Sequence, residues 1–172
     1  MRQFRKQDLT VWKQLQRMVT AFVFLGHGTS HTAKVSYSQM QTQMEELGFK
    51  NAFIGTVEGE PEDTACEAVI EKVKEAGYKK VILRPLMVVA GDHANNDMAG
   101  SEEDSWKSMF EASGSFDSVD AQIAGLGRID AVKQLYVDHT KAAIDSLGTE
   151  AATEDEAAEA ETAEAETEAA EE

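Results

Sequence analysis

The sequence has little of what builds cross-linked or sulfur-bound sites. It contains one cysteine in 172 residues, Cys66, which excludes an internal disulfide and any zinc or iron–sulfur cage made of cysteines. A lone cysteine is typically a small apolar core residue, and we expect Cys66 to be one. The hydrophobic share of 42% is ordinary for a globular protein with its own core.

Long hydrophobic runs and several familiar motifs are also absent. The apolar run near the amino terminus, residues 21–25, is too short for a membrane span or for the core of a signal peptide, so we expect a cytoplasmic protein. The sequence has no basic stripe with interleaved aromatic residues, which argues against a nucleic-acid partner. It also has no Walker loop, no Gly-x-Gly-x-x-Gly and no His-Glu-x-x-His.

Positive charge is missing from the last part of the chain. Residues 149–172 contain ten Glu and one Asp but no Lys or Arg, so without them the net charge of −16 falls to −5. They also contain no Leu, Ile, Val or aromatic residue. Such a segment cannot bury enough apolar surface to offset its ordering entropy. We therefore predict a disordered, acidic, low-complexity tail over residues 149–172.

A repeated alternation of strands and helices precedes this tail. At the start of the chain, Leu9, Trp12, Leu15 and Met18 are about one helical turn apart, which predicts an amphipathic helix within residues 1–19. Residues 20–148 alternate short apolar runs with segments of helical spacing, three of which are closed by glycine. This pattern indicates one α/β domain with a four-stranded parallel sheet and helices on both faces. The expected strands are 20–25, 51–54, 80–89 and 117–123, and the expected helices are 33–47, 62–76, 101–112 and 129–147.

Unusual polar residues follow the first three expected strands. His27, Glu58 and His93 lie 31 and 35 residues apart, about one strand–helix repeat each. The carboxyl ends of parallel strands share one edge of the sheet, where open α/β sheets bind ligands. Two imidazoles and a carboxylate suit a first-row divalent metal ion and leave coordination positions open. The sequence therefore predicts a metal site at this edge.

Other polar residues near these positions have plainer interpretations. Glu60 or Glu62 can replace Glu58 as the metal-binding carboxylate or can be solvated. His31 contacts a metal ligand from outside the site, contacts a carboxylate of the substrate, or is exposed. His139 is expected on the surface. Four residues after the third expected strand are expected mainly to hold their own loop through Asx-type turns: Asp92, Asn95, Asn96 and Asp97. Met87 and Met98 are expected to pack in the core.

Several segments closely resemble the anaerobic sirohydrochlorin cobalt chelatases. They are Phe-Leu-Gly-His-Gly-Thr-Ser-His from Phe24, Gly-Thr-Val-Glu-Gly-Glu-Pro from Gly55, Arg-Pro-Leu-Met-Val-Val-Ala-Gly-Asp-His-Ala-Asn-Asn-Asp-Met-Ala-Gly from Arg84, and Asp-Ser-Trp-Lys-Ser-Met from Asp104. The Gly-Leu-Gly at 125–127 and the Val-Asp-His from Val137 are similar as well. The resemblance extends from about residue 12 to residue 147.

The resemblance implies a chelatase-like domain and a lyase activity. The expected reaction is insertion of Co²⁺, the substrate metal, into a sirohydrochlorin-type tetrapyrrole in anaerobic cobalamin biosynthesis, a branch of porphyrin metabolism. Ni²⁺ and Fe²⁺ are alternatives in vitro, and no organic cofactor is expected. The implied catalytic residues are His27 and His93, which with Glu58 also bind the metal. The expected substrate contacts are Gly28, Thr29, Gly91 and Asp92.

The resemblance also implies something about partners. Family members are expected to have two facing α/β halves with the tetrapyrrole between them, and this sequence resembles the carboxyl-terminal half. We therefore expect either a homodimer or a separate chain equivalent to the amino-terminal half. Two alternatives stay open: a metal or tetrapyrrole carrier without turnover, and a scaffold whose tail binds a partner.

Overall fold

The computed structural model describes residues 19–147. Two compact units divide these residues, the first ending at Arg128 and the second beginning at Ile129. The sequence had grouped both in one domain over 20–148. Residues 1–18 of the expected amino-terminal helix and the expected tail, 149–172, lie outside the described residues.

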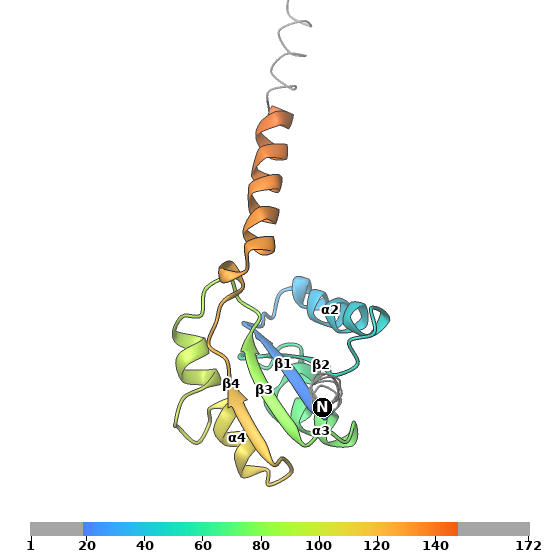
Figure 1. Ribbon diagram of the computed structural model, residues 1–172, viewed down its shortest axis with the longest axis vertical. Coiled ribbons are helices and arrows are strands. Elements are labelled where there is room, and N and C mark those ends of the chain that lie inside the picture. Colours follow the sequence, from blue (N-terminus) through green and yellow to red (C-terminus); the bar gives the residue numbers. More distant parts are fainter. Residues whose placement is uncertain (1–18, 148–172) are drawn as a thin grey trace, which may run out of the picture. The chain divides into compact units, whose positions relative to one another are not determined.

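A parallel four-stranded sheet forms the centre of the first unit. Its strands are β1 (Thr20–Gly26), β2 (Ala52–Thr56), β3 (Lys80–Pro85) and β4 (Ser118–Ala121), in the order β2-β1-β3-β4 (Figure 1). All neighbouring strands are parallel, and Gly26 is in register with Thr56. The prediction of a four-stranded parallel α/β sheet is confirmed. Its carboxyl ends lie along one edge, where the polar segments follow.

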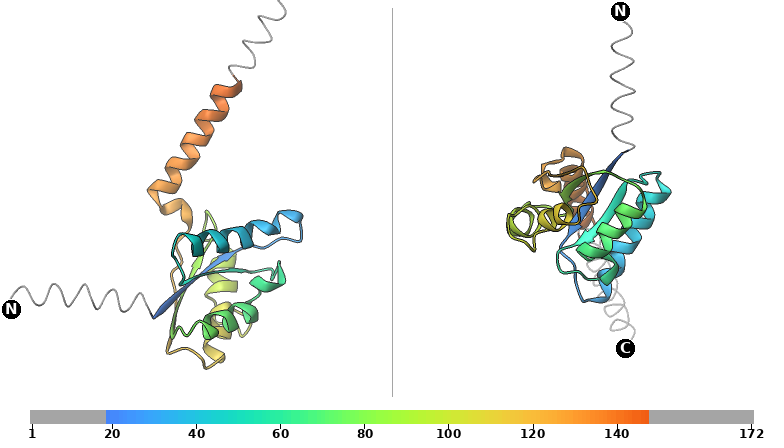
Figure 2. Two further views of the ribbon diagram at one scale, coloured as in Figure 1. Left: turned by 90° about the vertical axis from the view of Figure 1, so that its right-hand side faces the viewer. Right: turned by 90° about the horizontal axis from the view of Figure 1, so that it is seen from below.

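Helices cover both faces of this sheet, as predicted. Helix α2 (Val35–Glu46) lies on one face, whereas α3 (Cys66–Glu75) and α4 (Trp106–Ala112) lie on the other (Figure 2). The main core is on the α3 and α4 side. Alternate side chains of the central strands point to this face, because strand side chains alternate. Together with side chains of both helices they form the core: Ala21, Val23 and Leu25 from β1, Val81 and Leu83 from β3, Val69 and Val73 from α3, and Trp106 and Phe110 from α4.

Helix α2 is packed less completely than its apolar spacing suggested. None of its residues is buried, and Val35 is 56% exposed. The helix is joined to the edge strand β2 partly by polar bonds: Gln41 accepts from the Ile54 N–H at 2.9 Å and donates to the Ala52 carbonyl at 3.1 Å. Helical spacing places apolar residues on one side of a helix, but it does not show how much surface covers that side.

Several element boundaries differ from the sequence-based expectation for local reasons. The third strand ends at Pro85 and not at residue 89, because proline has no N–H for a further rung. The helix expected over 62–76 is broken by extended backbone at Ala65, so a short 3-10 turn, η2 (Glu62–Thr64), precedes α3. Helix α4 begins only at Trp106, where the Ser105 hydroxyl caps it by accepting from the Ser108 N–H at 3.2 Å.

The described part of the second unit is one long helix, 130–147. Its large apolar side chains are exposed, among them Tyr136 (55%), Ile144 (63%) and Leu147 (66%). Lys133 pairs with Asp130 at 2.6 Å, and Lys141 with Asp145 at 3.2 Å. Across residues 19–147, no helix is long and apolar enough to cross a lipid bilayer.

Candidate metal and substrate site

The structure brings the three predicted metal ligands to one edge of the sheet. His27 follows β1, and its Nε2 lies 3.9 Å from Oε1 of Glu58, which follows β2. On the other side, the rings of His27 and His93 meet edge to face with centroids 4.7 Å apart. We call His27, Glu58 and His93 the histidine cluster. Its central member follows the strand that lies between the other two.

Backbone pairing after β1 and β2 explains why His27 lies beside Glu58. The Glu58 N–H donates to the His27 carbonyl at 2.9 Å, and the Val57 N–H donates to the Gly26 carbonyl at 3.0 Å. Gly28, which follows His27, has φ of +96°, and a Cβ there would lie 2.9 Å from the Glu58 Cβ. Only glycine combines this backbone conformation with this close approach. The Gly-His-Gly sequence is therefore a structural requirement for the position of His27.

His93 is positioned by a rare helical turn. It directly precedes a π-helical segment, η3 (Ala94–Met98). Ala94 and Met98 are fully buried and anchor this segment in the core. His93 and Asp97 are likewise four residues apart, and His93 Nδ1 contacts Asp97 Oδ2 at 2.5 Å. Single π-helical turns are rare and occur frequently at functional sites.

The hydrogen bonds of the two histidines define which nitrogen of each ring is available. His27 Nδ1 lies 3.2 Å from the Gly28 carbonyl oxygen, and His93 Nδ1 contacts the Asp97 carboxylate. Both partners are acceptors, so each Nδ1 carries the proton and each neutral ring keeps its lone pair on Nε2. A histidine that ligates a metal commonly donates its other N–H in this way. Both imidazoles therefore present the nitrogen that can bind a cation.

The histidine cluster is open to solvent. The side chains of His27 and Glu58 are 55% and 52% exposed, and that of His93 is 38% exposed. Within residues 19–147, no three His, Cys, Asp or Glu side chains are arranged to enclose a metal ion. The cluster is thus an open face of donor groups at the sheet edge.

The other candidate carboxylates and histidines have separate contacts. Glu60 forms an ion pair with Lys34 at 3.2 Å, which distinguishes it from Glu58. His31 caps the short turn η1 (Thr32–Lys34), because its Nδ1 accepts from the Ala33 N–H at 3.1 Å. Glu62 is the first residue of η2, and His139 is an exposed residue of helix 130–147.

The predicted substrate contacts lie on the two loops that carry the histidines. Thr29 Oγ1 accepts from the His31 N–H at 3.1 Å. The Gly91 carbonyl accepts from Asn95 Nδ2 at 2.6 Å, and Asp92 accepts from Asn96 at 2.7 Å. These bonds hold the loop before η3. Sequence reasoning assigned Asp97 to the same task and missed its contact with His93, although the spacing of four residues is the helical signal for such a pair.

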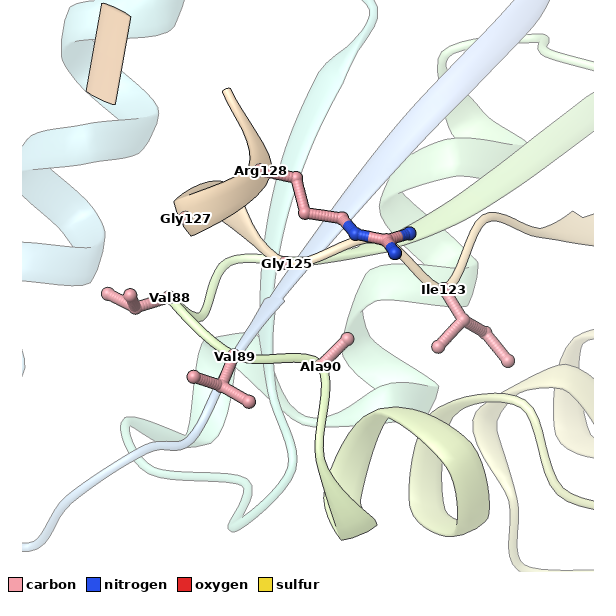
Figure 3. Close-up of a pocket in the computed structure, with 7 residues that line it drawn as sticks. All are labelled: Val88, Val89, Ala90, Ile123, Gly125, Gly127 and Arg128. Atoms are coloured by element: carbon pink, nitrogen blue, oxygen red, sulfur yellow. The ribbon is translucent and has the colours of Figure 1, made fainter. Parts of the chain in front are cut away.

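A cavity of about 590 Å³ adjoins the cluster along the same edge. We call it the Arg128 pocket. It lies between the segment after β3 and the segment after β4, which ends in the short turn η4 (Leu126–Arg128). The sequence had drawn attention to the Gly-Leu-Gly at 125–127 but not to the arginine that follows it. Figure 3 shows its lining, which consists of Val88, Val89, Ala90, Ile123, Gly125, Gly127 and Arg128.

Comparison with known proteins identifies the family. A model of the family described as cobalt chelatase (CbiK) matches residues 6–145. This chain belongs to the cobalt chelatase (CbiK) family. The chain is 38% identical over 136 residues to a sirohydrochlorin cobaltochelatase of Salmonella typhimurium, covering 79% of this chain and 49% of that one. It is 34% identical over 127 residues to the sirohydrochlorin cobaltochelatase CbiKC of Nitratidesulfovibrio vulgaris, covering 74% of this chain and 43% of that one.

A solved structure supports the fold of this family member. A cobalamin (vitamin B12) biosynthesis CbiX protein from Marinobacter aquaeolei VT8 superimposes with a TM-score of 0.56 at 16% identity, over 73% of this chain and 95% of that chain. This likeness confirms the α/β fold. The chain spans about half the length of the curated relatives that it matches.

Proposed function

We propose that this chain is a sirohydrochlorin cobaltochelatase, a lyase that inserts Co²⁺ into a sirohydrochlorin-type tetrapyrrole for cobalamin biosynthesis. One observation carries the proposal: His27, Glu58 and His93 meet at the edge of the sheet where the strands have their carboxyl ends (the carboxyl edge), and the Nε2 atoms of both histidines are available to bind a metal ion. Membership of the cobalt chelatase family supports it independently. We also propose that the protein acts in the cytoplasm.

Two imidazoles and one carboxylate have complementary tasks in this reaction. His27 and His93 bind the incoming Co²⁺ through Nε2, and Glu58 offsets part of the ionic charge at the partly exposed edge. Insertion forms metal–nitrogen bonds in the macrocycle and releases two pyrrole protons. Glu58 and the imidazoles, as they give up the metal, are the groups placed to accept these protons. Asp97 keeps the His93 proton on Nδ1, so the metal-binding nitrogen stays free.

The choice of metal is set by geometry and supply. For a given set of nitrogen and oxygen ligands, affinity rises from Fe²⁺ through Co²⁺ to Ni²⁺. Affinity alone thus favours Ni²⁺ over Co²⁺. We propose Co²⁺ as the substrate metal in the cell because the chain belongs to the cobalt chelatase family, and we expect Ni²⁺ and Fe²⁺ to be inserted in vitro. The reaction as proposed needs no organic cofactor.

A second protein wall completes the proposed site. The cluster is half-exposed, and a flat tetrapyrrole needs surface on both sides to exclude water. We propose that a second copy of this chain, or a separate chain, supplies the facing wall. Helix 130–147 by itself carries exposed apolar side chains, and exposed apolar patches mark surfaces that bind a partner. The alternative is a metal or tetrapyrrole carrier without turnover, which the openness of the cluster favours.

A metal-insertion assay tests the proposal and separates the alternatives. Purified protein is mixed with sirohydrochlorin and Co²⁺, and conversion is followed by absorbance. We expect turnover that His27→Ala abolishes and that His139→Ala, the same change on the exposed helix, leaves intact. Binding of both ligands without conversion indicates the carrier, whereas Co²⁺ binding that survives loss of both His27 and His93 indicates a scaffold. Normal turnover in His27→Ala would remove His27 from the mechanism.

A further inference from the structure

The Arg128 pocket is built by close backbone packing of two loops. The Leu126 N–H donates to the Met87 carbonyl at 2.8 Å, and the Gly127 N–H donates to the Val88 carbonyl at 2.9 Å. A Cβ on Gly125 would lie 2.5 Å from the Val88 carbonyl oxygen, so any side chain there would push the loops apart. The Gly-Leu-Gly segment thus fixes the residue that follows it, Arg128, against the loop that leads to His93.

The chemistry of the pocket is an apolar surface with one cation. Val88, Val89 and Ile123 line it and are exposed, as is Arg128. Figure 3 shows the Arg128 side chain extending past Gly125 toward the side of Ala90 and Ile123. No hydrogen bond or ion pair joins its guanidinium to another residue of 19–147. Such a pocket suits a ligand with a flat apolar body and a carboxylate arm.

The sheet order places this pocket beside the histidine cluster. The cluster follows β2, β1 and β3, whereas the pocket lies after β3 and β4. Ala90, which lines the pocket, is three residues before His93. β1 and β4 are two strand spacings apart, about 10 Å. A macrocycle centred over the histidines therefore brings its rim to the pocket, and the carboxylate arms of a sirohydrochlorin-type tetrapyrrole lie on that rim.

We propose that the Arg128 pocket binds a peripheral carboxylate arm of the tetrapyrrole. The guanidinium pairs with the carboxylate through two parallel hydrogen bonds, and the exposed valines contact the edge of the ring. This pairing fixes the rotation of the ring in its own plane, so that the ring nitrogens lie over His27 and His93. The inference rests on the proposed chelatase function and names how that same site holds its substrate.

Titration of sirohydrochlorin into metal-free protein tests this role. Arg128→Ala should weaken binding by about tenfold, the loss expected for a charge-assisted hydrogen bond. The sirohydrochlorin affinity of Arg128→Lys should lie between those of the unchanged protein and Arg128→Ala, because lysine keeps the charge but not the planar guanidinium. Lys80→Ala removes the same charge at the opposite, amino end of β3 and should bind as the unchanged protein does. Co²⁺ affinity, measured separately by calorimetry, should be equal in all four proteins.

Salt gives a second readout that a purely structural role would not change. Raising the ionic strength should weaken sirohydrochlorin binding in the unchanged protein more than in Arg128→Ala. Equal affinity and equal salt dependence in the two proteins would overturn the inference while leaving the chelatase proposal standing if Co²⁺ is still inserted. Failure of the unchanged protein to bind sirohydrochlorin and to insert Co²⁺ would overturn both, so the two failures are distinguishable.

Discussion

The two neighbouring parts of the carboxyl edge differ in chemistry. The histidine cluster presents polar donor atoms, held by backbone bonds and by Asp97, and it is half-exposed. The Arg128 pocket presents apolar side chains with a single cation. Metal ions bind to lone pairs, whereas a macrocycle binds through area and a few charged contacts. Under the proposed function the edge divides its work: the histidine cluster after β2, β1 and β3 binds the metal, and the Arg128 pocket after β3 and β4 binds a carboxylate arm of the macrocycle.

The sharpest way to break this division is to remove both imidazoles. His27→Ala/His93→Ala should lower Co²⁺ affinity by more than about 100-fold, because loss of a single outer partner of a metal ligand already costs about 10- to 100-fold. Sirohydrochlorin binding should be retained. Calorimetry with Co²⁺ and absorbance titration with sirohydrochlorin measure the two separately. Parallel loss of both affinities would show that the edge is one undivided site.

Substitution of Asp97 should lower the Co²⁺ affinity of the histidine cluster by less than loss of both imidazoles does. Asp97→Ala leaves the His93 Nδ1 proton without its acceptor and frees the ring to rotate, so Co²⁺ affinity should fall by about 10-fold or more. Asp97→Asn keeps a hydrogen-bond acceptor and should restore part of the affinity. Asp92→Ala, which removes only a bond to Asn96 in the same loop, is the matched control. Equal losses in Asp97→Ala and Asp92→Ala would indicate loop disruption instead of ring positioning.

A substitution at Gly125 tests the Arg128 pocket. Gly125→Ala places a methyl group against the Val88 carbonyl oxygen, and we expect about 1–3 kcal/mol of destabilisation together with weaker sirohydrochlorin binding. Gly91→Ala, at a glycine with open space around its Cβ position, should leave stability unchanged. Urea unfolding followed by fluorescence measures the stability of both variants, and absorbance titration measures sirohydrochlorin binding. Unchanged stability in Gly125→Ala would show that the two loops can separate freely.

Cys66 provides a small-effect control for all these variants. Burial, together with the neighbouring Glu67, raises the pKa of the Cys66 thiol, so the thiolate is suppressed at neutral pH. Iodoacetamide should therefore react slowly with the folded protein and fast in urea. A variant that has lost activity but keeps its slow reaction has kept its core. Fast reaction in the unchanged protein would show that the α3 face opens readily.

The order of strands and helices was predictable from the sequence because apolar runs and glycine stops are local signals. The strand–helix repeat also placed His27, Glu58 and His93 at one edge, since parallel strands end on the same side. The sequence favoured Glu58 and left Glu60 as an alternative; the ion pair that engages Glu60 needed the structure, because its partner Lys34 is 26 residues away. The strand expected over 80–89 ends at Pro85, where the missing N–H of proline is a local signal, whereas the break at Ala65 had no clear signal.

What the sequence could not give was side-chain pairing across loops. Asp97 was identified only as a loop residue, because its bond to His93 depends on the turn at η3. The Arg128 pocket depends on contact between segments about 40 residues apart, which no local pattern encodes. The exposure of Val35 on α2 likewise depends on how much surface covers the helix, and periodicity does not report this.

X-ray absorption of the Co²⁺-loaded protein tests most directly the central claim, that His27, Glu58 and His93 share one ion. The scattering pattern of imidazole should indicate two histidine ligands in the unchanged protein and one in His27→Ala, with His139→Ala unchanged. Two imidazoles that persist in His27→Ala, or none in the unchanged protein, would contradict the account.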